Sequence, residues 1–434
     1  MLRGGSNLKA TFSTRPAAER VITVGVDSPA RSEIEIEDSL DELDALASSA
    51  GAQVAGRIQQ RLKSVDPRTY VGRGKAAEIR ELASQRDATV AIFDEPLSPG
   101  QARNLENELK LRVLDRSQLI LDIFAQRART REGKLQVEIA QLSYLQPRLT
   151  RQWSHLSRQT GGSGAGGRIG TRGPGETQLE VDRRRIRERL SRLKARLRDV
   201  ERSRSIQRQR RLDVPYATVA LVGYTNSGKS TLMNAMTGAG VEAANRPFST
   251  LDPTIRRLQL PGNLQVMLAD TVGFIHRLPH TLIEAFKATL EEVRTADLLL
   301  HVVDASSTLL DEQIRVVDQV LEEIGAHDKP RLLVMNKADL LETAPHRFGA
   351  DAVAISALKA TGLDELRAAI ARALGLMREE VALTLPAARG DLIAMARRDG
   401  EIVAEDYADD VVAMRARVSA AVAGRLRKAA LSVS

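Results

Sequence analysis

The sequence predicts an α/β protein whose largest domain is a P-loop nucleotide-binding domain with a parallel, doubly wound sheet. Apolar segments that suit buried strands alternate with amphipathic helical segments along most of the chain. One such strand leads directly into "GYTNSGKST" at residues 223–231, which matches the G-x-x-x-x-G-K-[ST] pattern of a phosphate-binding loop. We expect a small α/β domain and an antiparallel helical hairpin before this domain, and a small α+β domain after it.

Length and composition indicate a globular protein with more than one domain. The 434 residues, 43% of them hydrophobic, suffice for about three domains of ordinary size. The chain has no cysteine, which excludes disulfides, thiolate metal sites and thiol redox chemistry. No apolar run approaches the ~18 to 20 residues that span a bilayer. We therefore expect a cytoplasmic protein that makes at most peripheral contact with membranes.

Residues 1–125 are expected to form the first α/β domain. Two segments read as buried strands, "RVITVGVD" and "ATVAIFDEP". Two others read as amphipathic helices, "DSLDELDALASSAG" and "GKAAEIRELASQRD". Such alternation is typical of strands that are joined by crossover helices.

Residues 126–212 are expected to form a coiled-coil hairpin. From about Ile120 the pattern predicts one long helix, whose apolar stripe consists of Leu135, Ile139, Leu142 and Leu149. The glycine-rich segment "GGSGAGGRIGTRGPG" follows at residues 161–175. Beyond it a heptad seam is formed by Leu179, Ile186, Leu190, Leu193, Leu197 and Val200. Two striped helices with a short connection predict an antiparallel pair, with the glycine loop at its tip.

The second helix of the hairpin is unusually basic. Between Asp182 and Leu212, 14 Lys and Arg residues stand against four Asp and Glu residues, a net charge of +10 in a chain whose total is +8. A charge run is usually a solvated helix face, but this concentration beside a glycine tip favours contact with RNA. A slim glycine backbone can enter a crowded RNA cavity, where arginine pairs with phosphate or stacks on bases. The candidate RNA-binding residues are Arg168, Arg172, Arg183, Arg184 and Arg185.

Residues 213–375 are expected to form the nucleotide-binding domain. Its predicted strands are "ATVALVG", "LQVMLAD", "ADLLLHVVD", "RLLVMNK" and "AVAIS". Helical segments follow most of them, which predicts a parallel sheet. Residues 376–434 are predicted to form the α+β domain, to which the sequence assigns no chemistry.

The phosphate-binding motif and two segments after it predict how a triphosphate is held. Glycines let the backbone N–H groups and the next helix's N-terminus face phosphate, while Lys229 reaches the β- and γ-phosphates. Ser230 offers a hydroxyl to Mg²⁺, and Thr250 in "FSTLDPT" is placed to bind the same ion. In "DTVG", Asp270 supports the metal through water and the N–H of Gly273 contacts the γ-phosphate. We predict Lys229, Thr250 and Gly273 as catalytic residues, with Ser230 and Thr250 as metal ligands.

Two later motifs indicate that the base is guanine. In "NKAD", the carboxylate of Asp339 can accept from both N1–H and the exocyclic amine of guanine, whereas adenine has no amine at that place. Backbone N–H groups of "SAL", at residues 356–358, can close over the base. The predicted GTP and GDP contacts are Gly223, Tyr224, Thr225, Asn226, Ser227, Gly228, Lys229, Ser230, Thr231, Phe248, Ser249, Thr250, Leu251, Asp252, Asp270, Thr271, Val272, Gly273, Asn336, Lys337, Ala338, Asp339, Ser356, Ala357 and Leu358.

With these motifs the chain resembles the HflX GTPases, a family of the translation-factor class. The resemblance spans residues from about 70 to 375 and rests on "EGKLQVEIAQLSYLQPRL", "GPGETQLEVDRRRIRERL", "GYTNSGKSTLMNA", "FSTLDPT" and "DTVGFI". It implies a GTPase domain, an N-terminal domain with a coiled-coil hairpin, and binding to the large ribosomal subunit with the hairpin loop near the peptidyl transferase region. It also implies splitting or rescue of stalled ribosomes under stress.

One position differs from many GTPases. The residue after Gly273 is Phe274, where a glutamine often orients the attacking water. An apolar ring cannot accept a proton from water, so we expect slow intrinsic hydrolysis that rises on ribosome binding. Two other functions stay open: a large-subunit assembly or RNA-remodelling NTPase that also uses ATP, and an adaptor that GTP switches without hydrolysis. We expect the protein to be a monomer in solution.

Overall fold

The computed structural model describes residues 18–27, 33–62, 64–152, 174–212, 216–238, 247–261, 264–276, 290–341, 352–375, 378–408 and 410–429. The chain divides into two compact units. The first comprises Met1–Gln126 and Tyr144–Ile186, and the second comprises Arg127–Ser143 and Arg187–Ser434. Within the described residues, no helix has both the length and the apolar character needed to cross a membrane.

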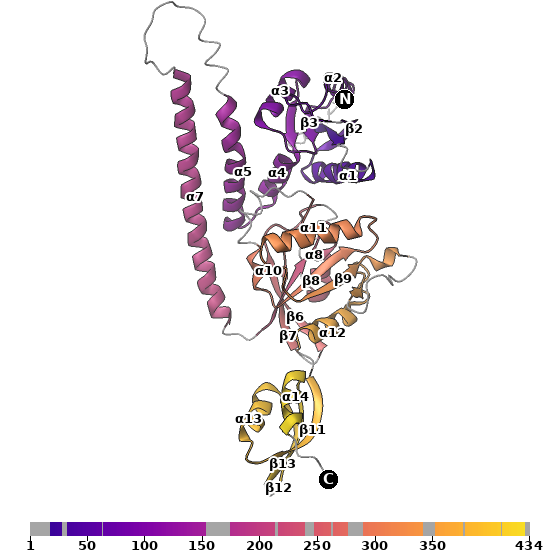
Figure 1. The fold of residues 1–434 in the computed structure, drawn as a ribbon, viewed down its shortest axis with the longest axis vertical. Helices are drawn as coiled ribbons and strands as arrows, with labels where there is room; N and C mark the ends of the chain where they lie inside the picture. The colour runs from indigo at the N-terminus through magenta and orange to yellow at the C-terminus, as the bar shows by residue number, and fades with distance from the viewer. Residues whose placement is uncertain are drawn as a thin grey trace, which may run out of the picture. The chain divides into compact units, whose positions relative to one another are not determined.

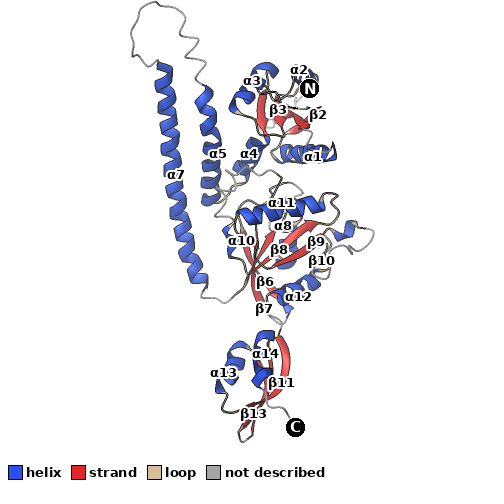
Figure 2. Cartoon of the chain, viewed as in Figure 1, coloured by secondary structure: helices blue, strands red, loops and turns tan. Residues whose placement is uncertain are grey.

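The first unit contains a parallel sheet of four strands in the order β2-β1-β3-β4. Figure 2 labels β2 and β3 of this sheet and the helices α1 to α4 of the same unit. The strands are β1 (Arg20–Asp27), β2 (Gln53–Arg61), β3 (Val90–Phe93) and β4 (Arg112–Asp115). The helices are α1 (Glu33–Ser49), α2 (Arg73–Gln85), α3 (Pro99–Leu109) and α4 (Arg116–Arg127). Buried apolar side chains of the strands pack with those of α2 and α3. The predicted α/β fold is confirmed, with two strands, the nine-residue β2 and the four-residue β4, that the sequence pattern did not reveal.

The hairpin helices are α5 (Arg131–Gln152) and α7 (Pro174–Leu212) (Figure 1). The expected single helix from about Ile120 is wrong, because α4 ends at Arg127 and α5 begins only at Arg131. Three residues, 128–130, therefore separate the two helices. At this break the backbone N–H groups of Arg129 and Thr130 donate to the carboxylate of Asp252.

The described parts of the two helices bury some of the apolar residues of the predicted stripes, whereas Leu142, Ile186, Leu197 and Val200 are half-buried. The buried positions are Leu135, Ile139, Leu190 and Leu193. An ion pair between Arg189 and Glu138, at 2.5 Å, joins α7 to α5 within the second unit. Most of the glycine loop and the candidates Arg168 and Arg172 fall within residues 153–173, which lie outside the described residues.

A buried ion network lies at the carboxyl ends of β3 and β4 in the first unit. The guanidinium of Arg116 pairs with Asp94 at 2.7 Å and also with Glu42, and the Arg116 side chain is 2% exposed. Beside it, Asp115 accepts a hydrogen bond from Arg148 of α5 at 2.7 Å. The network therefore fixes the second half of α5 to the sheet of the first unit.

The second unit contains a six-stranded sheet in the order β10-β9-β8-β5-β7-β6. The strands are β5 (Thr218–Val222), β6 (Thr254–Leu260), β7 (Leu264–Asp270), β8 (Leu298–Asp304), β9 (Arg331–Asn336) and β10 (Ala352–Ala354). The helices are α8 (Lys229–Thr237), α10 (Glu291–Thr295), α11 (Leu310–Glu323), the short 3₁₀ helix η2 (Ala338–Leu340) and α12 (Leu363–Ala373). The five predicted strands are parallel, as expected. The unpredicted β6 pairs antiparallel with β7 at the edge, and its alternating buried and exposed residues suit that place.

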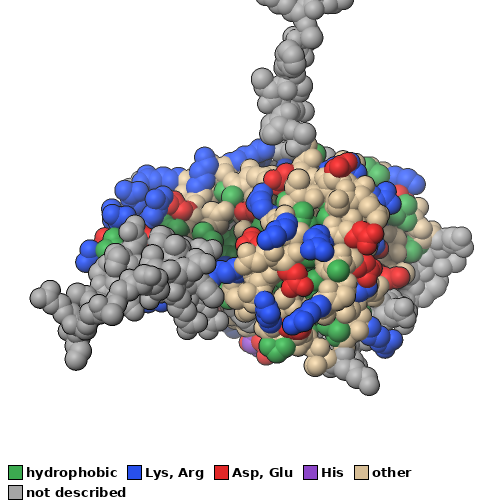
Figure 3. All heavy atoms as spheres, turned by 90° about the horizontal axis from the view of Figure 1, so that it is seen from above, with side chains coloured by type: hydrophobic (Ala, Val, Ile, Leu, Met, Phe, Trp, Pro, Cys, Tyr) green, Lys and Arg blue, Asp and Glu red, His purple; other side chains and the backbone are tan. Residues whose placement is uncertain are grey.

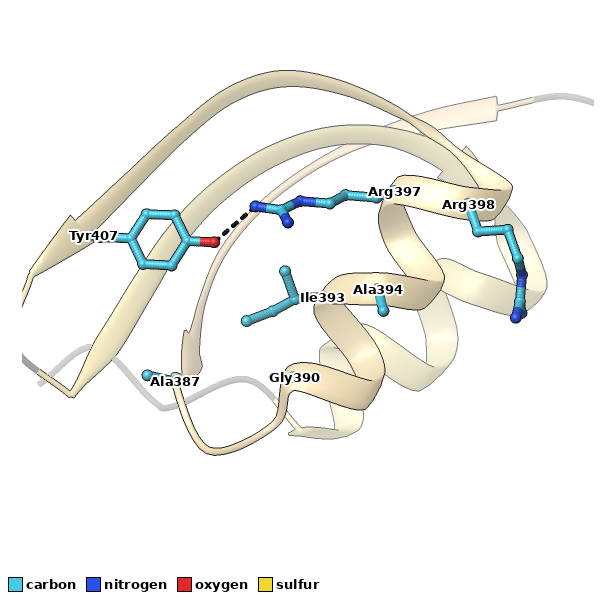
Figure 4. A pocket seen from close by; sticks show the side chains of 7 residues that line it. All are labelled: Ala387, Gly390, Ile393, Ala394, Arg397, Arg398 and Tyr407. Atoms are coloured by element: carbon cyan, nitrogen blue, oxygen red, sulfur yellow. Dashed lines mark hydrogen bonds between the residues drawn. The ribbon is translucent and has the colours of Figure 1, made fainter.

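The C-terminal residues form the predicted α+β module. Its elements are β11 (Arg378–Pro386), α13 (Gly390–Asp399), β12 (Glu401–Ala408), β13 (Val411–Ser419) and α14 (Ala420–Ala429). The antiparallel sheet has the order β11-β13-β12, and β12 contains a bulge between Ile402 and Ala404. A hollow of about 550 Å³ lies between α13 and β12, where Arg397 donates a hydrogen bond to the Tyr407 hydroxyl at 2.8 Å (Figure 4).

Removing the guanidinium of Arg116 leaves the carboxylates of Asp94 and Glu42 without their cation. We expect Arg116→Ala to lower the free energy of unfolding of the first unit by about 3–5 kcal/mol. Hydrogen exchange at the β3 amides, measured with increasing denaturant, reports this value. Arg112→Ala is the matched control, because it breaks an exposed pair with Glu19 and should cost at most about 1 kcal/mol. Equal losses in the two variants would contradict the argument from burial.

Candidate active site

The loop after β5 has a backbone that requires glycine at two positions. Gly223 has φ 152° and Gly228 has φ 93°. A Cβ on Gly223 would lie 2.2 Å from the carbonyl oxygen of Val302. One on Gly228 would lie 2.1 Å from Nδ2 of Asn336. The loop thus passes tightly against the ends of β8 and β9, and α8 begins directly after it, so the unpaired N–H groups of that helix end are available for an anion.

Backbone carbonyl groups of this loop hold the side chain of Lys229 in place. The side chain is buried, and Nζ donates to the carbonyl oxygens of Gly223 at 3.0 Å and Tyr224 at 2.7 Å. Burial lowers the pKa of Lys229 to about 8, an effect that the nearby carboxylate of Asp270 opposes. A Cβ on Gly273 would lie 3.1 Å from Nζ, so glycine keeps the space beside the ammonium open. Phosphate oxygens accept more strongly than carbonyls, which suits the ammonium to a bound triphosphate.

Three oxygen atoms converge next to Lys229. Ser230 Oγ lies 2.7 Å from Thr250 Oγ1 and 2.8 Å from Asp270 Oδ2. The distance from Thr250 Oγ1 to Asp270 Oδ2 is 3.0 Å. The second carboxylate oxygen, Asp270 Oδ1, is buried without a hydrogen-bond partner, and burial raises the pKa of this carboxyl. A small hard cation prefers such oxygen atoms, so this group of residues fits the predicted Mg²⁺.

Asn336 connects the phosphate loop to the segment that is predicted to close over the base. Its Nδ2 donates to the carbonyl oxygen of Ser227 at 2.8 Å. Its Oδ1 accepts from the backbone N–H of Ala357 at 2.9 Å. Asn336 is buried and uses both ends of its amide on backbone groups. It therefore fixes the distance between the two segments.

Asp339 is kept ionised at the far end of the same cavity. A hydrogen bond from Ser356 lowers the pKa of the Asp339 carboxyl, and Lys359 Nζ lies 3.5 Å from it. An ionised carboxylate is an acceptor only, as a guanine edge with two donors requires. Leu340 and Leu358, which are 63% and 81% exposed, line the cavity beside it. Leu340 was not predicted from the sequence, although it directly follows the "NKAD" motif.

These groups surround one cavity of about 510 Å³, a volume typical of small-ligand sites. It is lined by Leu340 and by 17 of the predicted residues: Thr225, Asn226, Gly228, Lys229, Ser230, Thr231, Phe248, Ser249, Thr250, Thr271, Gly273, Asn336, Lys337, Asp339, Ser356, Ala357 and Leu358. The other predicted residues do not line it: Gly223, Tyr224, Ser227, Leu251, Asp252, Asp270, Val272 and Ala338. Several of these support the wall from behind, whereas Asp252 accepts hydrogen bonds from the start of α5.

Phe274 is buried below the phosphate loop. It is 1% exposed and belongs to a core cluster with Val222 and Leu290. The backbone is fixed as well, because Thr225 N donates to Phe274 O at 2.7 Å and Phe274 N donates to Gly223 O at 3.1 Å. The ring is therefore part of the support of the loop, and its chemistry excludes it as an acceptor for the attacking water.

Three of the candidate RNA-binding residues are described, and all lie on α7 in the first unit. Arg184 and Arg185 are exposed, and Arg183 is half-buried. Arg185 pairs with Asp182 at 3.7 Å while its side chain remains 74% exposed. None of the three lines the nucleotide cavity.

Fold and site together define a P-loop GTPase. Family models agree with this along the chain. Residues 37–125 match the model described as "GTP-binding GTPase N-terminal", residues 127–211 match "GTP-binding GTPase Middle Region", and residues 218–337 match "50S ribosome-binding GTPase".

Curated relatives then narrow the class to one family. The chain is 45% identical to GTPase HflX of Caldanaerobacter subterraneus subsp. tengcongensis over 414 residues, which are 95% of this chain and 94% of the relative. It is 50% identical to GTPase HflX of Escherichia coli over 361 residues, 82% and 83% of the two chains. The chain belongs to the HflX family and is a GTP-hydrolysing enzyme. A solved GTP-binding protein from Sulfolobus solfataricus in complex with GDP aligns at 26% identity with a TM-score of 0.44, covering 82% of this chain and 98% of that chain.

Replacing Asp339 by Asn exchanges one acceptor for a donor at the base edge. Xanthine carries an oxygen where guanine carries the exocyclic amine, so the variant should complement xanthine. We expect Asp339→Asn to weaken GDP binding by at least about 100-fold and to tighten binding of xanthosine diphosphate. Displacement of a fluorescent nucleotide measures both affinities. Lys359→Ala removes only the ion pair and should change GDP affinity less than about fivefold; an Asn variant that still prefers guanine would show that Asp339 does not read the base.

Proposed function

We propose that this GTPase acts on ribosomes: it binds rRNA of the large subunit near the peptidyl transferase region through its basic hairpin, and it splits or rescues stalled ribosomes. The observation that carries the proposal is the presence of a guanine-nucleotide site and a helix segment of net charge +10 in one chain. The description of the matched GTPase model, "50S ribosome-binding GTPase", supports the choice of partner. The protein would work as a monomer in the cytoplasm, where ribosomes are.

Hydrolysis would use the groups that converge on the phosphates. Ser230 and Thr250 would hold Mg²⁺, with Asp270 behind them, and the ion would neutralise charge on the β- and γ-phosphates. The ammonium of Lys229 would stabilise the charge that develops on the γ-phosphate, and the N–H of Gly273 would bind one of its oxygens. Since Phe274 cannot orient water, the chain alone would hydrolyse GTP slowly, and ribosome binding would complete the site.

The nucleotide would also control binding to the ribosome. Thr250 and Gly273 lie on two different segments that line the same cavity, where both would contact the γ-phosphate. A γ-phosphate orders such segments and its loss releases them. The triphosphate state would therefore bind the large subunit, and the diphosphate state would dissociate from it.

The charge of α7 supports RNA as the ligand of the hairpin. Most side chains from Glu180 to Val200 are exposed and many of them are arginines. Figure 3 shows Lys and Arg side chains at many places on the drawn face, interspersed with Asp and Glu side chains. The binding constant for the large subunit should then fall as salt is added. Each phosphate contact should contribute about −0.7 to −0.9 to the slope of the logarithm of the binding constant against the logarithm of the salt concentration.

The direct test measures GTP hydrolysis with the small subunit, the large subunit and intact ribosomes, together with light scattering for dissociation of the subunits. We expect stimulation by the large subunit and loss of scattering when GTP is present. Stimulation by precursor subunits alone would favour an assembly factor, and competition by ATP would favour a general NTPase. Binding without multiple turnover would favour an adaptor. Each of these outcomes would overturn the proposal.

Charge reversal on α7 tests the RNA contact separately from the GTPase. We expect Arg184→Glu with Arg185→Glu to weaken large-subunit binding at least about tenfold and to reduce the salt slope by about 1 to 2. Intrinsic GTP hydrolysis should be unchanged, since neither residue lines the cavity. Arg425 and Arg427, exposed on α14, provide the matched control when both are replaced by Glu. Equal losses in the two double variants would mean that only net charge matters and that α7 is not the site.

A further inference from the structure

The segment that carries Thr250 is attached to the start of hairpin helix α5 through the side chain of Asp252. Asp252 Oδ2 accepts hydrogen bonds from the backbone N–H groups of Arg129 and Thr130, each at 2.9 Å. Asp252 Oδ1 accepts from the hydroxyl of Thr130 at 2.5 Å. All three groups lie within the second unit. One carboxylate thus satisfies three donors that precede a helix.

The same hydroxyl caps α5. Thr130 Oγ1 accepts from the backbone N–H of Gly133 at 2.9 Å, and Gly133 is the third residue of the helix. This is the geometry of an N-cap, which satisfies an amide that the helix itself leaves unpaired. Because the hydroxyl donates to Asp252, the carboxylate orients the cap and adds negative charge at the positive end of the helix. A Cβ on Gly133 would lie 2.5 Å from Asp252 Oδ1, so a glycine leaves room for the carboxylate.

This contact explains the break between α4 and α5. The chain leaves the helix after Arg127 and starts a new one at Arg131. Asp252, which is 122 residues further along the chain than Thr130, accepts the two backbone donors in the break. The start of α5 therefore depends on where the segment of Asp252 lies.

The other end of that segment lies in the phosphate site. Thr250 Oγ1 is 2.7 Å from Ser230 Oγ and 3.0 Å from Asp270 Oδ2. Leu251, the one residue between Thr250 and Asp252, is buried. A movement of Thr250 cannot be absorbed over so short a distance, so it must change the contact between Asp252 and α5.

We propose that Asp252 is a positioning residue for GTP hydrolysis, which couples the nucleotide state to the first turn of α5. The inference rests on the proposed role of Thr250 at the γ-phosphate. When the γ-phosphate orders Thr250, Asp252 is held against residues 129–130 and the cap is complete; when the γ-phosphate is lost, the cap weakens. Linked equilibria are reciprocal, so an intact start of α5 favours the triphosphate by the same factor.

The test compares GDP with a non-hydrolysable GTP analogue in the full chain. In the wild-type protein we expect hydrogen exchange at the first-turn amides of α5 to be at least about fivefold slower when the analogue is bound than when GDP is bound. Asp252→Ala should abolish this difference, weaken the analogue relative to GDP by the same factor, and lower kcat. Asp252→Asn should restore part of each effect, since an amide oxygen still accepts from the backbone donors. Equal exchange in both nucleotide states of the wild-type protein, or an unchanged affinity ratio in Asp252→Ala, would overturn the inference.

Two further variants separate the possible failures. Ser98→Ala removes the N-cap of α3, where Ser98 Oγ accepts from Gln101 N at 3.2 Å. Like Asp252→Ala, it should lower the free energy of unfolding, but it should leave the ratio of analogue affinity to GDP affinity unchanged. A change of that ratio similar to the change in Asp252→Ala would mean that the loss of any helix cap alters nucleotide preference. Thr250→Ala should reduce kcat with GDP affinity unchanged. If Thr250→Ala is inactive and Asp252→Ala is normal, only this inference fails. If Thr250→Ala hydrolyses GTP normally, both the proposed role of Thr250 and this inference fail.

Discussion

The nucleotide site depends on the parallel hydrogen bonding of β5, β8 and β9. Parallel strands end at the same edge of a sheet, so the loops that follow them meet there. Asp304 of β8 pairs in register with Asn336 of β9, and the phosphate loop follows β5 directly. Asn336 then reaches the loop carbonyl of Ser227, 109 residues earlier in the chain. Without the register of these strands, the groups for phosphate and base would not share one cavity.

The cavity has a fixed part and a part supplied by another segment. The fixed part includes Lys229, whose ammonium already donates to two backbone carbonyls. It also includes the backbone of Gly223 and Thr225, which is hydrogen-bonded to the backbone of Phe274. Both features hold the site in shape independently of a γ-phosphate. Thr250 comes from the segment before β6, and its hydroxyl meets Ser230 and Asp270 through side-chain contacts only. Affinity for any guanine nucleotide would therefore reside in the fixed part, and under the proposed role of Thr250 its segment would discriminate the triphosphate.

The sequence predicted what is encoded within short segments and missed what is encoded between distant ones. The phosphate loop and the "NKAD" motif are contiguous, and each residue type is required by local chemistry, so most of the cavity wall was foreseeable. The break before Arg131 was not, because an apolar stripe does not record that a remote carboxylate accepts the backbone donors. The antiparallel strand β6 was missed for a related reason: it lies at the sheet edge, and its exposed residues include Arg256 and Arg257. A short amphipathic segment of this kind resembles a loop when it is read alone.

The C-terminal sheet, with its bulged strand, has a consequence for how the protein behaves at high concentration. In the order β11-β13-β12 each outer strand pairs on one side only with another described strand, and unpaired strand sides tend to recruit strands from other molecules. On β12 the bulge between Ile402 and Ala404 breaks the regular spacing of donors and acceptors, and Glu401, Glu405 and Asp406 give that strand negative charge. Both features disfavour the addition of a further strand. The sequence of β12 itself therefore protects this side of the module against edge-to-edge aggregation.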